Sequence, residues 1–213
     1  MEMCAEGKFG PGPLQNQLRI AWVRFNKWAK VNKLGCTVPC FTPASVGRPG
    51  NTSRSYPELE SAIKGHSLKC LLRWIAAACE ESSRVSNNDD EADNNSMLRA
   101  SCLYALTGLV HHLDSCGQWL GKPEGERARS LGDLFMRSYS MLASKAYARN
   151  DCKWKWRPKF HGLSHGIDMA ANGENIGRYS TWMDEDFVGK IGRVCGKTHR
   201  ATMPQRSIQR CLP

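Results

Sequence analysis

The 213-residue sequence has no long hydrophobic run. Its longest apolar stretch, 74–79, lies between Arg73 and Glu80 and is much shorter than the roughly 20 residues of a membrane-spanning helix. The first residues include Glu2 and Glu6 and contain no apolar block, so they do not resemble a secretory signal. We therefore expect an intracellular protein, in the nucleus or the cytoplasm, that has no membrane partner.

Several motifs of cofactor binding are also missing. The sequence has no P-loop, no dinucleotide-binding glycine pattern and no Cys-x-x-Cys pair. Its ten cysteines lack the dense spacing of a small secreted disulfide scaffold, so we expect reduced thiols. These absences favour a chain that is not an enzyme by itself and has no cofactor. The alternative is that a cluster of acids binds Mg²⁺ or that a cluster of histidines binds Zn²⁺.

Acidic residues are missing from one long stretch of the chain. Between Arg19 and Arg54 there are seven Lys or Arg and no Asp or Glu, and basic residues also outnumber acidic ones in 151–213. The net charge is +10. Basic zones of this kind attract polyanions, because binding releases the counterions of a phosphate backbone. The alternative is that the surplus of Lys and Arg only keeps the surface soluble.

Four segments place apolar residues at the three- and four-residue spacing of amphipathic helices. They are residues 14–31, 61–81, 98–113 and 124–149. The last three follow one another and cannot bury their apolar stripes alone, so we expect them to pack in an antiparallel arrangement. The predicted fold is mainly α, an antiparallel helical bundle core with a small irregular or short-strand C-terminal section.

The chain divides into three predicted sections. Residues 1–57 form an N-terminal basic helix and a linker or surface loop, since Pro and Gly recur from 35 to 57. Residues 58–150 form the helical bundle, with an acidic, Asn-rich loop at 82–96 that we expect to be disordered. Residues 151–213 form a basic C-terminal section with short strands and helices.

Two segments alternate cations with aromatic rings. They read Arg24-Phe-Asn-Lys-Trp and Lys153-Trp-Lys-Trp-Arg. This mixture is used to stack bases and to bind phosphates. It is equally typical of Trp buried in a core with Lys on the solvent side. The predicted nucleic-acid-binding residues are Arg24, Lys27, Lys30, Lys153, Trp154, Lys155, Trp156, Arg157 and Lys159.

Three adjacent acids, Asp184, Glu185 and Asp186, are the candidate catalytic residues. Carboxylates can coordinate Mg²⁺, although phosphoryl-transfer sites gather them from several separate elements. The alternative is that they begin a helix, where the helix dipole favours negative charge.

Three histidines are the candidate metal ligands: His161, His165 and His199. A helical His-x-x-x-His would put two rings on one face, as zinc sites use. We expect no helix here because Pro158, Gly162 and Gly166 interrupt the segment, and the Glu of a zincin motif is missing. The alternative is that these histidines lie in turns and form hydrogen bonds with the backbone.

Five short motifs resemble parts of a known group of proteins. They are Phe25-Asn-Lys-Trp, Tyr56-Pro-Glu-Leu, Arg157-Pro-Lys-Phe-His with His165, Arg178-Tyr-Ser and Asp184-Glu-Asp-Phe-Val-Gly-Lys. In this order they resemble the C-terminal portion of uncharacterised multicopy proteins of protist genomes that derive from mobile elements. The resemblance covers most of the chain from about Leu18 and implies no stated activity.

A second resemblance is to the C-terminal part of transposases with an RNase H-like fold. It implies that 68–149 is a helical insertion and that Glu185, or a neighbouring Asp, matches the last catalytic acid. The earlier catalytic aspartates of such enzymes would lie upstream of Met1. The second resemblance therefore implies a metal-dependent nuclease or transposase fragment.

The predicted function is that of a non-catalytic nucleic-acid-binding remnant or fragment of a mobile-element protein, with DNA or RNA as the partner. Two alternatives remain open. One is a helical protein–protein interaction module without a nucleic-acid partner, and the other is the metal-dependent nuclease or transposase fragment.

Overall fold

The computed structural model describes residues 2–47, 63, 65–84, 91–151 and 153–179. These residues are mainly helical, which confirms the predicted fold class, and they contain no β-strand. The chain divides into two compact units, Met1–Ile176 and Gly177–Pro213, and only the first three residues of the second are described. The account that follows therefore concerns the first unit.

The N-terminal part of this unit has its own apolar core. Helix α1 (Glu2–Ala5) precedes α2 (Leu14–Val31), and α3 (Gly65–Arg84) packs against α2. The helices predicted at 14–31 and 61–81 are therefore confirmed, the second within the residues described. We call the following buried residues the N-terminal core: Cys4, Phe9, Leu18, Ala21, Phe25, Ala29, Val38, Phe41, Cys70, Leu71 and Trp74.

The segment after α2 is a packed part of this core. As predicted, residues 34–43 form no helix or strand, and only a short 3₁₀ turn, η1 (Ala44–Val46), follows. However, Val38 and Phe41 are buried, and the indole nitrogen of Trp22 donates a hydrogen bond to the carbonyl of Val38 at 2.9 Å. The described part of the predicted linker is thus fastened to α2, because its two apolar side chains contribute to the core.

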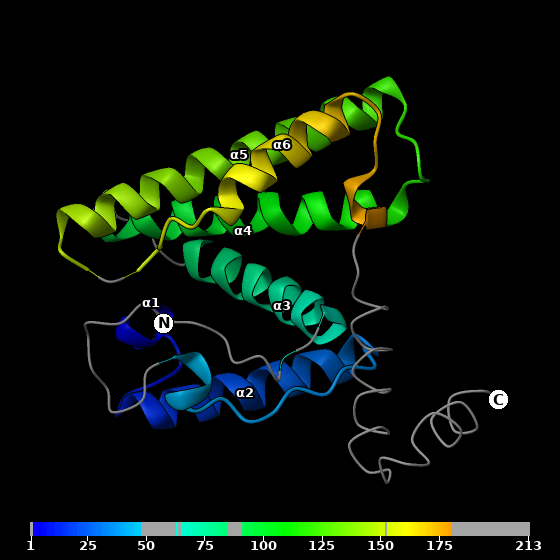
Figure 1. Ribbon diagram of the computed structural model, residues 1–213. Helices are drawn as coiled ribbons and strands as arrows, with labels where there is room; N and C mark the ends of the chain where they lie inside the picture. The colour runs from blue at the N-terminus through cyan, green and yellow to red at the C-terminus, as the bar shows by residue number, and fades with distance from the viewer. Residues whose placement is uncertain (1, 48–62, 64, 85–90, 152, 180–213) are drawn as a thin grey trace, which may run out of the picture. The chain divides into compact units, whose positions relative to one another are not determined.

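Three further helices form a second layer of the unit. Helices α4 (Glu91–Ser115), α5 (Lys122–Ala148) and α6 (Lys159–Ala171) lie side by side, and α3 packs against α4 (Figure 1). Neighbours run antiparallel, since one apolar cluster joins the end of α4 to the start of α5 and the end of α6. Its main members are Leu109, Leu113, Ala128 and Ala170. The second cluster joins the opposite ends through Cys102, Ala105, Phe135, Leu142 and Phe160.

The acidic loop predicted at 82–96 is shorter in the structure. Helix α3 continues to Arg84 and α4 begins at Glu91, and residues 85–90 lie outside the described residues. The side chains of Ser96 and Arg99 are buried. Contacts made by the first turns of α4 with other elements therefore hold a polar sequence in a helix.

Helix α6 is the largest correction to the sequence analysis. The segment around His161 and His165 was predicted to be non-helical, with short strands nearby, yet it is a helix of 13 residues. Pro158 stands at the start of this helix, where a proline is tolerated because the first helical N–H groups have no partner. Packing against α5 outweighs the weak helix propensity of Gly162 and Gly166.

The contact between α5 and α6 depends on a glycine in α5. A Cβ atom added to Gly132 would lie 2.5 Å from Cγ1 of Ile167 on α6. The two helices can approach this closely only because position 132 has no side chain. Gly132 therefore acts through packing.

Candidate functional site

A second group of aromatic rings lies where α5 meets the segment before α6. We call residues 153–159 the aromatic–basic segment. The hydroxyl of Tyr139 on α5 donates a hydrogen bond to the carbonyl of Lys155 at 2.9 Å. Trp154 and Trp156 both stand edge-on to the ring of Tyr139, with centroid distances of 5.3 and 6.0 Å. Trp156 also meets the ring of Phe160 edge-on at 5.0 Å. Tyr139 therefore holds the backbone and both indoles of the segment.

The two tryptophans of this segment have different environments. Trp154 is partly buried and packs on the apolar cluster of α4, α5 and α6, whereas 50% of Trp156 is exposed. The side chains of Lys155, Arg157 and Lys159 are also exposed. Of the predicted nucleic-acid-binding residues, Trp156 and these three cations thus share one accessible segment.

Lys153 forms an ion pair with a neighbouring acid. Its ammonium group lies 2.7 Å from a carboxylate oxygen of Asp151, and both side chains are partly buried. Its positive charge is therefore largely compensated within the protein.

The predicted residues on α2 lie on its solvent-facing side. Arg24, Lys27 and Lys30 are exposed, while Phe25 between them is buried in the N-terminal core. The guanidinium of Arg24 donates to the carbonyl of Lys8 at 3.2 Å and stacks over the ring of Phe9. For this segment the structure agrees with the alternative interpretation, in which the rings belong to the core and the cations face water.

An apolar cavity of about 460 Å³ lies next to the aromatic–basic segment. One wall comes from the N-terminal core, through side chains such as Leu18, Phe41, Leu71 and Ile75. The other wall comes from Leu103, Tyr139, Trp154 and Phe160. Four basic side chains also line it, namely Arg99, Lys153, Lys155 and Arg157, and no acidic residue of the described part does.

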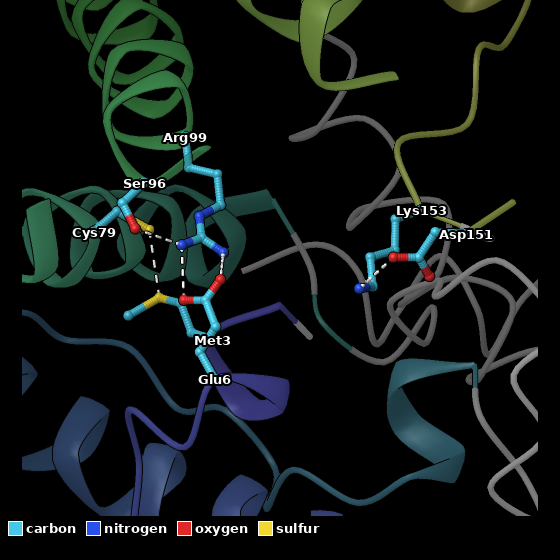
Figure 2. A network of polar contacts seen from close by, with 7 residues as sticks. All are labelled: Met3, Glu6, Cys79, Ser96, Arg99, Asp151 and Lys153. Carbon is cyan, nitrogen blue, oxygen red and sulfur yellow. Dashed lines mark hydrogen bonds and ion pairs between the residues drawn. The ribbon is translucent and has the colours of Figure 1, made fainter. Parts of the chain in front are cut away.

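Arg99 is a buried cation at this cavity that the sequence analysis did not single out. Figure 2 shows its guanidinium facing the carboxylate of Glu6, with nitrogen–oxygen distances of 2.6 and 2.8 Å. A third bond runs to the hydroxyl of Ser96 at 2.9 Å. The Arg99 side chain is only 5% exposed, against 36% for Glu6. One signal was available, because Arg99 stands three residues before Cys102, on the apolar face of α4.

A sulfur contact lies beside this ion pair. The thiol of Cys79 on α3 lies 3.4 Å from the sulfur of Met3 (Figure 2). Together with the Glu6–Arg99 pair, it connects α1 and the residue that follows it to α3 and α4. The first residues of the chain are therefore part of the wall around the cavity.

The two described histidines of the predicted metal set do face each other. Because α6 is a helix, His161 and His165 lie one turn apart, and their Nε2 atoms are 3.0 Å apart. Both are exposed, so an ion has access to them. His199 lies outside the described residues, and within those residues no cluster of three or more metal-ligating side chains is found. The described geometry therefore offers a two-nitrogen chelate.

The same helix carries a serine motif that the sequence analysis overlooked. Gly162-Leu-Ser164-His-Gly166 matches the pattern G-x-S-x-G of nucleophile elbows, which need a sharp turn between a strand and a helix. Here the motif lies inside α6, and the Ser164 hydroxyl donates to the carbonyl of His161 at 2.7 Å. This geometry does not activate the serine as a nucleophile.

The candidate catalytic acids Asp184, Glu185 and Asp186 lie outside the described residues. The Tyr56 and Asp184 motifs of the mobile-element resemblance lie outside them as well. The predicted Mg²⁺ site therefore stays a prediction.

Comparisons with known proteins identify no relative. No protein-family model, no curated protein and no solved structure matches the chain. Among the described residues, no helix has the length and apolar character needed to cross a membrane.

Proposed function

We propose that the chain binds single-stranded DNA or RNA through the aromatic–basic segment, without catalysis of its own. The observation that carries this proposal is Trp156, a half-exposed indole supported from behind by Tyr139 and Phe160. It stands between the exposed cations Lys155 and Arg157.

The chemistry of this arrangement suits a single strand. An unpaired base can stack on the accessible part of the indole, while neighbouring ammonium and guanidinium groups contact phosphates. Stacking on an aromatic side chain contributes about 1–3 kcal/mol per base. The rings behind Trp156 restrict its motion, so less conformational entropy is lost on binding.

One further observation supports a nucleic-acid partner. The exposed cations Arg24, Lys27 and Lys30 form a second basic zone that attracts phosphates without regard to sequence.

The first test replaces the indole. We expect Trp156→Ala to weaken the binding of labelled oligo-dT and oligo-U by about tenfold, measured by fluorescence polarisation. Trp119→Ala is the matched control, because Trp119 is 68% exposed and belongs to neither the aromatic–basic segment nor the cavity. Equal losses in both variants, with native helix content, would show that Trp156 has no special role.

The second test removes two charges. The variant Lys155→Gln/Lys159→Gln is compared with Lys122→Gln/Arg127→Gln, which removes two exposed cations elsewhere. We expect the first pair to lower the slope of log affinity against log salt by about 1 to 1.5 and the second to leave it nearly unchanged. If neither DNA nor RNA binds even at low salt, the helical protein–protein module becomes the better account.

A further inference from the structure

Helix α6 brings two exposed imidazole rings together. His161 and His165 lie one helical turn apart, and their Nε2 atoms are 3.0 Å from each other. The ring centroids are 4.4 Å apart, and the ring planes make an angle of 76°. At this separation the Nε2–H of one ring donates a hydrogen bond to the Nε2 of the other. One proton therefore lies between two nitrogen atoms that can both bind a metal ion.

The distance between these nitrogens suits a transition-metal ion. Metal–imidazole bonds are about 2.0–2.1 Å long. Two nitrogens 3.0 Å apart, each at this distance from one ion, make an angle of roughly 90–100° at the ion. This angle is close to that between neighbouring ligands of a square-planar or octahedral ion, and a small increase makes it tetrahedral. The pair can therefore chelate an ion after the rings turn both lone pairs toward it.

Chelation also preserves the charge of the two rings. In the hydrogen-bonded pair, one neutral ring carries its proton on Nε2 and the other carries it on Nδ1. When an ion takes the place of the shared proton, the first ring becomes the Nδ1–H tautomer as well. No proton is gained or lost in this exchange.

Contacts with α5 hold the helix that carries the pair. Phe160 stacks on Phe135 of α5 with ring centroids 6.1 Å apart, and Ile167 packs against Gly132. The carboxylate of Asp168 pairs with the guanidinium of Arg129 on α5 at 2.5 Å. Because α6 is already formed and packed, an ion that binds there does not have to order a helical turn.

We propose that His161 and His165 form a binding site for a late first-row transition-metal ion, namely Cu²⁺, Ni²⁺ or Zn²⁺. Imidazole nitrogen suits these ions, whereas Mg²⁺ and Ca²⁺ prefer oxygen ligands. The affinity of a nitrogen site rises from Co²⁺ through Ni²⁺ to Cu²⁺ and is lower for Zn²⁺ than for Cu²⁺. This site goes beyond nucleic-acid binding and does not depend on it.

Titration of the full chain with Ni²⁺, followed by calorimetry, tests the two ligands. The thiols are first alkylated with iodoacetamide, because cysteine also binds such ions. We expect His161→Gln and His165→Gln each to weaken the binding of about one Ni²⁺ by at least about tenfold, since the second contact of a chelate is intramolecular. Excess Mg²⁺ should not compete.

His111→Gln is the matched control, because it removes an exposed histidine from α4 and is expected to keep the wild-type affinity. An unchanged affinity in either His161→Gln or His165→Gln, with native helix content, would overturn the proposal.

A relocated histidine tests the spacing. The variant Lys159→His/His161→Gln keeps the number of histidines but places two of them six residues apart, on different sides of α6. We expect it to bind Ni²⁺ as weakly as His161→Gln. Wild-type affinity would show that the spacing of His161 and His165 is not what binds the ion.

Bound Cu²⁺ gives a spectroscopic measure of the ligands. In electron paramagnetic resonance, the alkylated wild-type chain with equimolar Cu²⁺ should show coupling to the nitrogens of both rings. Each single Gln variant should lose one of these nitrogens. A spectrum that neither substitution changes would contradict the assignment.

The metal site and the proposed nucleic-acid site can fail separately. His161 follows the aromatic–basic segment, so His161→Gln is expected to lose Ni²⁺ binding and to keep oligo-dT binding. Trp156→Ala is expected to do the reverse. If a folded Trp156→Ala variant lost Ni²⁺ binding, the ligands would not be the two histidines alone, and the proposal would be wrong.

Discussion

Aromatic residues gather in two regions of the chain, and the two regions differ in how far they bury their rings. In the N-terminal core, Phe25 is fully buried and is packed against Phe41 and Trp74. At the aromatic–basic segment, Trp156 is also surrounded by rings, but half of its surface stays accessible. In the first region the rings close a core. In the second region two rings support a third ring that is exposed.

The same sequence pattern gives both environments. Arg24-Phe-Asn-Lys-Trp and Lys153-Trp-Lys-Trp-Arg each alternate cations with rings. On α2 the helical period turns Phe25 inward and leaves the cations in water. Before α6 the chain has no regular period, and here the cations and one indole are exposed. Whether a ring of this pattern is buried or exposed therefore depends on the backbone that carries it.

The largest expected effect comes from removing the buried ring in this comparison. Phe25→Ala should lower the free energy of unfolding by about 3–5 kcal/mol, since it removes a fully buried ring. Trp156→Ala should cost about 1 kcal/mol or less, because the indole is already half exposed. Urea denaturation measures both. Similar costs for the two variants would mean that Trp156 is a core residue and would remove the basis of the proposed function.

The ion pair of Arg99 with Glu6 tests the contact between the N-terminal residues and α4. Arg99→Ala should cost about 2–3 kcal/mol, less than for a fully buried pair because Glu6 stays 36% exposed. Arg84→Ala provides the control: its pair with Glu80 is exposed, and we expect about 0.5 kcal/mol or less. A cost for Arg99→Ala no larger than that of the control would show that α1 is not fastened to α4.

The same contrast between buried and exposed side chains predicts different reactivities for two cysteines. Burial raises the pKa of Cys102 to about 12, from 9.0, whereas Cys40 is exposed. The folded state thus favours the Cys102 thiol, and this contribution to stability is present below pH 9 and lost as pH rises towards 12. At pH 8 we expect iodoacetate to modify Cys40 at least about tenfold faster than Cys102. Peptide mass spectrometry measures both rates, and equal rates would show that the interior of the bundle is open.

The smallest expected effect concerns the exposed histidine pair. We predict that Zn²⁺ binds His161 and His165 together and, at ten times its dissociation constant, stabilises the fold by about 1.4 kcal/mol. Thermal denaturation checks this with His161→Gln, and with His111→Gln as an exposed control on α4. Stabilisation that survives His161→Gln would place the metal elsewhere.

Helices with a regular apolar period were predictable from the sequence. The bounds of α2 and the positions of α4 and α5 follow from that period. Helix α6 was missed because local rules weigh Pro158, Gly162 and Gly166 against a helix, and only packing on α5 outweighs them. Local reasoning contains no information on such packing.

For a similar reason, only part of the candidate site could be predicted from the sequence. The pattern at 153–157 pointed to the aromatic–basic segment, but not to Tyr139, which holds it from another helix. The partner of Arg99 is 93 residues away along the chain. The position of Arg99 on the apolar face of α4 signals its burial, but no local signal identifies its partner, because an ion pair between distant segments depends on tertiary structure.

The salt dependence of oligonucleotide binding tests the central claim most directly. The affinity of the chain for a single strand of about 16 nucleotides is measured between about 50 and 200 mM salt. We predict a linear fall of log affinity with log salt, with a shallower line for Lys155→Gln/Lys159→Gln. Absent binding, or an affinity that does not change with salt, would contradict a function based on phosphate contacts.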